Sequence, residues 1–387
     1  MLLIKNAQVF APQALGSVDL LVAGGTLVAM EKNIDVRGIA SEVYDAQGQW
    51  LVPGFVDSLV HIIGGGGEGG FATRTPELNP ADAIKAGVTT MVGVLGTDAT
   101  CRSLGELFGK TKALNAIGLN CYMHSGSYQL PVQTLTGDLR KDIMLVEPII
   151  GVGEIAIADH RGSQPTWREL VRVASDARVA GMLAGKSGVV SIHVGEDESA
   201  LDVLHEVVAK SAIPINQFYP THIGRSDSLI ERGVAFARMG GFLDFTTSTT
   251  PDILAMGERR ASESAQIALE KGVPLCQMTF SSDAQGSLPH FNGNGQLDGL
   301  EVGGIDSLWL EVAHLIDRKV LSVTDALKLI TENPAKILGL PHGKISLNGG
   351  ANFALVDPGT LTITGTMNRG KWLMRDTEVL AKSMFER

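Results

Sequence analysis

The middle of the chain alternates short apolar runs with longer segments of helical periodicity. From about residue 51 onwards, eight apolar runs are predicted to be strands: Gly54–His61, Thr89–Gly93, Asn120–Met123, Ile149–Ile155, Val189–His193, Ile215–Pro220, Phe242–Thr246 and Cys276–Ser281. Helical patterns lie between most of them and after the last: Leu104–Ile117, Trp167–Ala180, Leu201–Lys210, Leu229–Arg238, Ser262–Lys271, Ile305–Arg318 and Val323–Asn333. Alternating strands and helices predict an α/β fold, and eight such strands predict a closed (β/α)8 TIM barrel.

The two ends of the chain follow a different pattern. Short apolar runs separated by glycine and proline predict strands at both ends: Leu2–Ile4, Val18–Val22, Thr26–Met30, Phe353–Val356, Leu361–Ile363 and Lys371–Met374. Gly24 and Gly25 supply a hairpin turn between two of these strands. We therefore predict a small, discontinuous β-sandwich domain, built from residues 1–50 and 345–387, that brackets a barrel of residues 51–344.

Composition and charge narrow the class of protein. Of the 387 residues, 44% are hydrophobic and 19% are charged, so the chain can bury a large core. The net charge of −10, without clusters of lysine or arginine, argues against a nucleic-acid surface. Three widely spaced cysteines give no disulfide framework, and neither an export signal nor a membrane-spanning apolar run is visible. These features predict a cytoplasmic protein that does not bind membranes.

Polar side chains follow the predicted strands where barrel enzymes carry their chemistry. His61, Thr97, Tyr128, Glu154, His193, His222, Thr247 and Asp283 lie at or just beyond the ends of successive strands. A single histidine on a strand is more often an incidental core residue than a ligand. His193 and His222 lie on neighbouring strands and can converge on one divalent metal ion, so the metal interpretation is favoured for the pair.

Two acidic residues fit the same site. Glu154 lies inside an apolar strand, where a carboxylate is costly unless a metal ion or a salt bridge, for example to Arg161, neutralises it. Asp283 follows the eighth strand, where it can ligate a metal and act as a general base toward water, or instead cap a helix. We expect both residues to be metal ligands.

Charged residues near these positions predict the chemistry of the substrate. Arg161 and Arg225 suit carboxylates, unless they are ordinary surface residues. Glu68, in the glycine-rich segment Gly64–Gly70, suits a cationic amine. This segment formally matches the dinucleotide-binding G-x-G-x-x-G pattern, but Glu68 would repel a pyrophosphate and no helical pattern follows directly. The charges predict a small, dipeptide-like substrate with one amine and two carboxylates.

Several stretches of the sequence resemble a known family. They are PGFVDSLVH, HIIGGGGEGGFATRTPE, GVTTMVGVLGTD, SGSYQLP, ADHR, YPTHIGR, FSSDAQGS and ENPAKILGL. Together they resemble the amidohydrolase superfamily and, within it, the bacterial isoaspartyl dipeptidases. The resemblance covers nearly the whole chain. It implies a zinc-dependent hydrolase of β-aspartyl (isoaspartyl) dipeptides, assembled as a homo-oligomer.

The resemblance also implies a role for each matching position. Glu68 and Thr97 would form the pocket for the substrate's amine, and Arg161, Arg225 and Ser287 would hold its carboxylates. Tyr128 would polarise the scissile carbonyl and stabilise the oxyanion. Asp283 would move a proton from the attacking water to the leaving amine. The implied metal ligands are His61, Glu154, His193, His222 and Asp283.

Two positions depart from the family pattern. The first strand of the family carries His-x-His, and here Leu59 replaces the first histidine. Glu154 stands where the resemblance implies a carbamylated lysine that bridges two metals. Both changes affect the same metal site. We therefore expect one firm zinc site, formed by Glu154, His193 and His222, and a second site that is weak or absent.

Three functions remain open at this stage. The first is the cleavage of β-aspartyl dipeptides. The second is the hydrolysis of a related amide, such as an N-acyl amino acid. The third is ligand binding by a homologue with little or no activity, because Leu59 and Glu154 alter the metal site.

The expected loss of one metal site can be measured directly. Because Leu59 cannot ligate a metal, purified protein dialysed against zinc should retain about one tightly bound zinc ion per chain. Elemental analysis of metal content checks this. Two tightly bound zinc ions per chain would refute the hypothesis.

Overall fold

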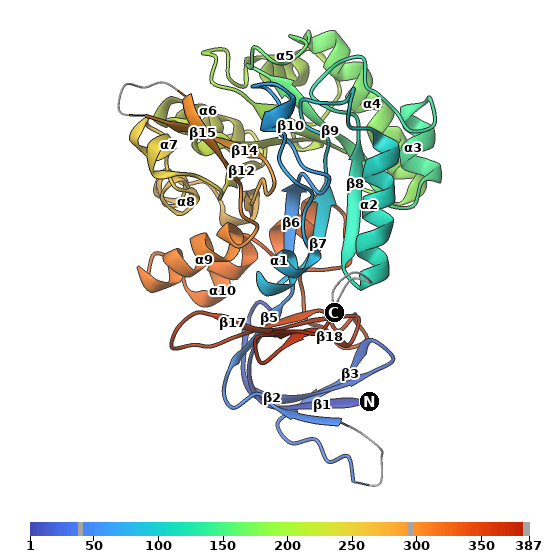
Figure 1. The fold of residues 1–387 in the computed structure, drawn as a ribbon, viewed down its shortest axis with the longest axis vertical. Coiled ribbons are helices and arrows are strands. Elements are labelled where there is room, and N and C mark those ends of the chain that lie inside the picture. Colours follow the sequence, from blue (N-terminus) through green and yellow to red (C-terminus); the bar gives the residue numbers. More distant parts are fainter. Residues whose placement is uncertain (38–41, 293–296, 382–387) are drawn as a thin grey trace.

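The computed structural model describes residues 1–37, 42–292 and 297–381 (Figure 1). Residues 38–41 and 382–387, which belong to the predicted end domain, therefore lie outside the described residues. Figure 1 shows the strands from both chain ends beneath the parallel strands of the middle of the chain. In the part of the chain that the structure describes, no helix has the length and apolar character needed to cross a bilayer.

Strands from both chain ends form one mixed sheet. They are β1 (Leu2–Phe10), β2 (Ala14–Ala23), β3 (Thr26–Glu31), β4 (Glu42–Asp45), β5 (Trp50–Pro53), β16 (Phe353–Val356), β17 (Ile363–Asn368), β18 (Lys371–Arg375) and β19 (Glu378–Val379). The hydrogen-bonded order is β19-β18-β17-β16-β5-β1-β2-β3, with β4 paired to β1. The two ends thus pair as predicted. However, the described strands form one continuous sheet, not the two separate sheets of a sandwich.

Eight parallel strands occupy the middle of the chain. They are β6 (Phe55–Val60), β7 (Val88–Gly93), β8 (Asn120–Ser125), β9 (Ile149–Ile157), β10 (Val189–Val194), β11 (Phe218–Thr221), β12 (Leu243–Thr246) and β13 (Met278–Ser281). Each matches a predicted strand, although the sixth and eighth begin later than expected. The residues before them, Ile215–Gln217 and Leu275–Gln277, form 3-10 turns.

The predicted closed barrel is confirmed only in part. Strands β6 to β11 form a six-stranded parallel sheet, while β12 and β13 form a separate pair. A single bridge between Val60 and Ala284 connects the end of β13 to β6. The last three strands are only four residues long, and Pro220 in β11 has no N–H to donate. Few ladder bonds can therefore form between β11 and β12.

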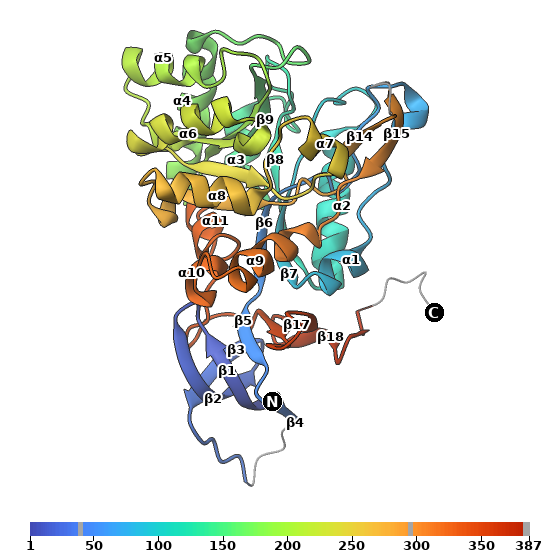
Figure 2. The ribbon, with the colours of Figure 1, turned by 90° about the vertical axis from the view of Figure 1, so that its left-hand side faces the viewer.

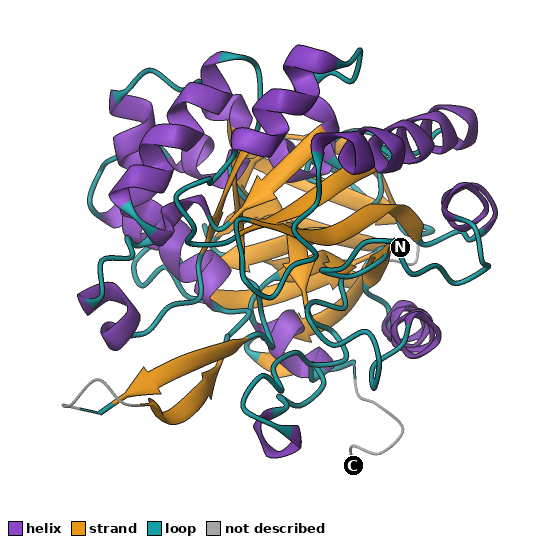
Figure 3. Cartoon of the chain, turned by 90° about the horizontal axis from the view of Figure 1, so that it is seen from above, coloured by secondary structure: helices purple, strands orange, loops and turns teal. Residues whose placement is uncertain are grey.

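Helices surround the parallel strands (Figure 3). Those that match predicted helices are α2 (Leu104–Ile117), α4 (Trp167–Ala184), α5 (Asp202–Lys210), α6 (Asp227–Arg238), α8 (Ala261–Glu270) and α9 (Ser307–Asp317). The pattern missed α1 (Pro80–Lys85), α3 (Leu139–Leu145), α7 (Pro251–Ala255) and the hairpin of β14 (Ser287–Phe291) and β15 (Leu297–Val302). Figure 2 shows this hairpin at the end of the molecule away from the mixed sheet.

The last predicted helix is two helices in the structure. The segment Val323–Asn333 divides into α10 (Val323–Lys328) and α11, which continues as Glu332–Ile337. Thr331 precedes α11 with non-helical torsion angles, φ −134° and ψ −88°. Pro334 lies in the first turn of α11, where its missing N–H does not interrupt the helix. The predicted continuous helix is therefore wrong.

A buried histidine should make stability depend on pH. His124 in β8 is fully buried, and burial lowers its pKa to about 4. Between about pH 6.5 and pH 4, the unfolded chain therefore binds a proton that folded His124 does not. Acidification from pH 6.5 to 4.5 should reduce the free energy of unfolding by about 1–3 kcal/mol through this residue alone.

The variant His124→Leu isolates this contribution, because leucine has a similar size and does not titrate. Denaturant unfolding of both metal-free proteins at several pH values gives the difference in slope. We expect the variant to lose less stability on acidification than the unmodified protein. Equal losses for the two proteins would contradict a neutral buried His124.

Candidate active site

The ends of neighbouring strands bring Glu154, His193 and His222 together. Glu154 lies in β9, His193 lies in β10, and His222 follows β11 directly. Because these strands are neighbours in the parallel sheet, their carboxyl ends meet at one edge. One ligand atom from each residue lies within 4.8 Å of the others, and all three side chains are buried. The structure thus assembles the predicted three-ligand set.

Electrostatics keep two of these side chains in the forms that bind metal ions. Glu154 Oε1 lies 2.9 Å from His193 Nδ1 and 3.9 Å from His222 Nε2. Burial alone would raise the pKa of Glu154, but its interactions with the two neighbouring histidines hold it well below its usual range. Burial and the charge of Arg225 lower the pKa of His222 to about 4. At neutral pH, the carboxylate is ionised and the His222 imidazole is neutral, as metal binding requires.

The second carboxylate oxygen of Glu154 is also suited to binding a cation. Among the described residues, no donor lies within hydrogen-bond distance of Glu154 Oε2, although this atom is buried. A carboxylate oxygen in that situation is unfavourable unless a cation neutralises it. One carboxylate and two imidazoles are ligands that zinc and other divalent metals accept. The residues present therefore fit a divalent metal ion.

His61 and Asp283 form a second, smaller group. His61 Nε2 lies 3.0 Å from Asp283 Oδ1, and backbone bonds between the end of β6 and the segment after β13 hold the pair. Burial lowers the pKa of His61, but the hydrogen bond and charge of Asp283 outweigh burial and raise it. Within the described part of the chain, the two do not belong to a set of three potential ligands. Leu59, two residues before His61, is buried.

Tyr128 lies against the three-ligand set. Its hydroxyl is 2.7 Å from His193 Nδ1, and the two rings lie 4.4 Å apart between centroids. Burial and the negative charge of Glu154 raise the pKa of Tyr128 well above its usual range. The phenol therefore keeps its proton and can donate a hydrogen bond to a developing negative charge.

Glu68, Thr97 and Arg161 form a charged group at the mouth of the site. Glu68 Oε1 accepts a hydrogen bond from Thr97 Oγ1 at 2.8 Å and lies 3.4 Å from Arg161 Nη1. The Glu68 and Arg161 side chains are 36% and 32% exposed, so a small solute can reach them. One carboxylate and one guanidinium group thus lie side by side next to the buried cluster.

Arg225 and Ser287 come from different segments of the chain. Arg225 Nη1 donates to the Val194 carbonyl at 2.8 Å and lies 3.3 Å from His193 Nε2. Arg161 Nη2 approaches the same nitrogen at 3.4 Å, so the two guanidinium groups flank His193. Ser287 begins β14 and lies beside Gly66, where an added Cβ would come within 3.1 Å of the serine Cβ.

Close backbone contacts hold the glycine-rich segment. Buried Arg102 donates to the carbonyls of Ile63 and Thr75 at 3.1 and 3.0 Å. Gly64 has a φ of +80°, and an added Cβ would lie 2.3 Å from the Thr75 carbonyl oxygen. A side chain at this position would therefore force the segment that carries Glu68 to move.

The sequence did not identify two residues that contact the site. Asp159 lies 2.9 Å from His193 Nε2 and binds the Arg161 guanidinium through both carboxylate oxygens. Thr246 Oγ1 lies 2.5 Å from His222 Nδ1. Asp159 precedes Arg161 by two residues, and this acidic–basic spacing was the one visible signal. Thr246 ends a predicted strand, but nothing distinguishes it from other threonines at strand ends.

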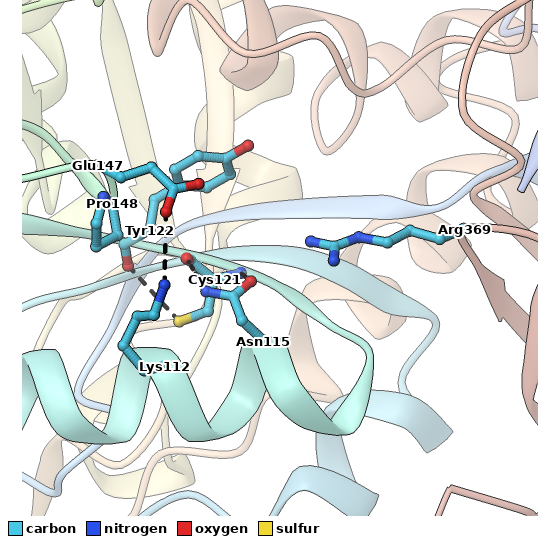
Figure 4. Close-up of a pocket in the computed structure, with 7 residues that line it drawn as sticks. All are labelled: Lys112, Asn115, Cys121, Tyr122, Glu147, Pro148 and Arg369. Atoms are coloured by element: carbon cyan, nitrogen blue, oxygen red, sulfur yellow. Dashed lines mark hydrogen bonds and ion pairs between the residues drawn. The ribbon is translucent and has the colours of Figure 1, made fainter.

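A separate hollow lies away from these residues (Figure 4). Its volume is about 160 Å³, and its lining comes from α2, the start of β8 and the segments around Glu147 and Arg369. Cys121 and Tyr122 lie near the amino end of β8, whereas the candidate site lies at the carboxyl ends of the strands. The predicted site residues are absent from the described lining of this hollow.

Comparisons with known proteins agree with this geometry. The model of the amidohydrolase family matches residues 50–375. The chain is 42% identical, with a TM-score of 0.91, to a β-aspartyl dipeptidase from Fervidobacterium islandicum AW-1 in complex with β-Asp-Leu dipeptide, over all of both chains. A second structure of that organism's β-aspartyl dipeptidase is 40% identical, with a TM-score of 0.90, again over all of both chains.

More distant relatives carry other names. A dihydroorotase from Aquifex aeolicus is 24% identical over 99% of this chain and 93% of its own length. A D-hydantoinase structure from a Bacillus species is 16% identical, with a TM-score of 0.70, over all of both chains. At these identities the likeness supports the fold and leaves the substrate open.

The role of Leu59 can be tested by restoring a histidine. Leu59 lies in β6 and His61 follows this strand directly. Because alternate residues of an extended chain point to the same face, Leu59→His is expected to place a second imidazole near the His61–Asp283 pair. We expect the zinc content after dialysis to rise from about one to about two ions per chain. Leu59→Gln, which adds polarity without an imidazole, should stay near one. A folded Leu59→His variant with unchanged zinc content would contradict this explanation.

Proposed function

Since the chain belongs to the amidohydrolase family, we propose that it is a metal-dependent hydrolase that cleaves β-aspartyl (isoaspartyl) dipeptides at the side-chain amide. The observation that carries this proposal is the position of Glu68 and Arg161. They form an adjacent acid–base pair at the mouth of a buried Glu154–His193–His222 cluster. The substrate has the complementary charges, an ammonium group and two carboxylates.

Substrate recognition follows from these charges. Glu68 accepts hydrogen bonds from the ammonium group, and Thr97 holds the Glu68 carboxylate through its hydroxyl. Arg161 and Arg225 bind the carboxylates, because a planar guanidinium group matches carboxylate geometry. Ser287 contributes a hydroxyl from the side of the glycine-rich segment. The match of charges favours a dipeptide over a neutral amide.

The chemistry requires a proton carrier and a donor to the oxyanion. Asp283 accepts a proton from the attacking water as the oxygen bonds to the amide carbon. The Tyr128 hydroxyl donates to the carbonyl oxygen, which becomes negative at the same time. Asp283 then returns the proton to the amide nitrogen when the C–N bond breaks. A divalent ion, when bound, supplies Lewis acidity and lowers the pKa of a coordinated water.

We expect the two metal positions to bind with different affinities. Glu154, His193 and His222 are proposed to hold one zinc ion firmly, because all three are buried and mutually close. His61 and Asp283 offer fewer ligands, since Leu59 replaces the remaining histidine of the family pattern. Zinc is proposed because imidazole and carboxylate ligands in a three-residue set suit it well.

Two related proposals concern the whole molecule. We propose that the eight parallel strands act as a barrel of residues 51–344, with the bridge between Val60 and Ala284 at its closing edge. The division from an end domain of residues 1–50 and 345–387 stays a prediction. A homo-oligomeric state and a cytoplasmic location also stay predictions.

Two alternatives remain distinct from this proposal. One is hydrolysis of a related amide, such as an N-acyl amino acid, which lacks the free amine that Glu68 would bind. The other is a homologue that binds the dipeptide with little turnover because of Leu59 and Glu154. The dihydroorotase names of distant relatives make dihydroorotate a third compound to include in a comparison of substrates.

The proposal predicts release of leucine from β-aspartyl-leucine when zinc is present. Asp283→Asn should lower kcat by about 10²–10⁴-fold, because it removes the proton carrier while preserving the size of the side chain. Glu68→Gln should mainly raise KM, because it removes the charge that attracts the ammonium group. Chromatography of the released leucine, with zinc and with a chelator, measures both effects.

The outcomes separate the alternatives. Faster hydrolysis of an N-acyl amino acid or dihydroorotate than of the dipeptide would overturn the assigned substrate. Binding of the dipeptide without leucine release in the presence of zinc would favour the inactive homologue. Equal activity with and without zinc would overturn the proposed metal dependence.

A further inference from the structure

Asp159 occupies an unusual position between two functional groups of the candidate site. It follows β9 and is only 7% exposed. Its Oδ2 atom lies 2.9 Å from His193 Nε2 and 2.6 Å from Arg161 Nη2. Its Oδ1 atom accepts hydrogen bonds from Arg161 Nε at 3.0 Å and from the Arg161 backbone at 2.8 Å. One carboxylate therefore contacts both a proposed metal ligand and a proposed substrate-binding residue.

The contact with His193 bears on which ring nitrogen can bind a metal. Glu154 faces Nδ1 and Asp159 faces Nε2, each with a carboxylate oxygen at 2.9 Å. A metal ion beside Glu154 needs the lone pair of Nδ1, so the ring proton is then on Nε2, where Asp159 accepts its hydrogen bond. Histidines that bind metals commonly donate their other N–H to a carboxylate, which fixes the ring. Nearby guanidinium nitrogens lie farther from Nε2, at 3.3 and 3.4 Å.

The contact with Arg161 fixes the direction of the guanidinium group. Asp159 accepts hydrogen bonds from Arg161 Nε and Nη2, and these two bonds fix the plane of the guanidinium group. Arg161 Nη1 points instead toward Glu68, at 3.4 Å, and the group lies 5.5 Å from the centre of the Tyr128 ring. The remaining N–H groups are thereby held at the mouth of the site, where a carboxylate can reach them.

We propose that Asp159 is a positioning residue that ties the metal ligand His193 to the carboxylate-binding Arg161. Through His193 it orients Nδ1 toward the metal position, and through Arg161 it orients the group that recognises the substrate. The Arg161 part of this inference rests on the proposed function, whereas the His193 part requires only that a metal binds. Asp159 itself touches neither the reacting atoms nor the substrate.

The variant Asp159→Asn tests both parts, because asparagine has the same size but no charge. Zinc affinity, measured by competition with a chromophoric chelator, should fall by about 10–100-fold. The KM for β-aspartyl-leucine at saturating zinc should rise by about tenfold or more, while kcat changes less.

Asp227→Asn is the matched control. It breaks a similar carboxylate–arginine pair, with bonds of 2.8 and 2.9 Å to Arg259, on the exposed surface. It should leave both values unchanged.

A second comparison separates positioning from general loss of structure. Arg161→Met should raise KM, because it removes the guanidinium group, and should leave zinc affinity within about twofold, because Asp159 keeps its own contact with His193 Nε2. The double variant Asp159→Asn/Arg161→Met should have a KM close to that of Arg161→Met, since Asp159 acts on the substrate through Arg161. Additive increases in KM would overturn that part of the inference.

The remaining outcomes are also decisive. Unchanged zinc affinity in folded Asp159→Asn would overturn the link to His193. If the unmodified protein released no leucine, the proposed function would fail, but the zinc measurement would still decide the His193 part. Should Asp159→Asn not fold, Asp159→Glu serves instead. Its longer side chain keeps the charge but displaces the carboxylate, so smaller losses of the same kind are expected, and their absence would overturn the inference.

Discussion

The buried carboxylate of Glu154 is the constraint on which the site depends. It lies inside β9, where every residue is buried, and an ionised carboxylate there is strongly unfavourable without compensation. His193 at 2.9 Å and His222 at 3.9 Å provide part of that compensation. A divalent cation would provide the rest at Glu154 Oε2, the oxygen for which the described residues offer no donor. The requirement to neutralise one side chain thus accounts for the cluster around it.

The parallel strands meet this constraint through their register. Residues on β9 and β10 are hydrogen-bonded neighbours, and His193 pairs with Ala156, two residues beyond Glu154. The end of β13 reaches β6 through the bridge between Val60 and Ala284, which places Asp283 against His61. The five predicted metal ligands therefore lie at or just beyond the carboxyl ends of these strands, and the structure brings three of them within 4.8 Å of one another. Leu59, which stands where the family pattern has a histidine, is buried within β6.

The sequence predicts those parts of the site that local patterns determine. Apolar runs located the eight strands, and polar residues at their ends located Glu154, His193 and His222, because strand direction alone places them on one edge. Contacts between loops follow no such local pattern in the sequence, so they could not be predicted. Asp159 reaches His193 only because the chain turns after β9, with Ala158 at a φ of +52°. Arg102 holds the glycine-rich segment by donating to backbone carbonyls. Every residue has such a carbonyl, so the sequence does not show which ones Arg102 contacts.

Charge balance connects the metal cluster with the proposed substrate. Glu68, Asp159 and Glu154 place negative charge within a short distance of one another, and Arg161 interacts with the first two. Glu154 is left to the histidines, of which His222 has a pKa of about 4 and is neutral at pH 7. Arg161 and Arg225 together offset the charges of Glu68 and Asp159, whereas the described residues give Glu154 no guanidinium partner, so the interior of the site is short of positive charge. A divalent cation would offset the charge of Glu154, while the ammonium group and the carboxylates of the proposed substrate would pair with Glu68 and with the two guanidinium groups. Both the cation and the charged dipeptide belong to the proposed function.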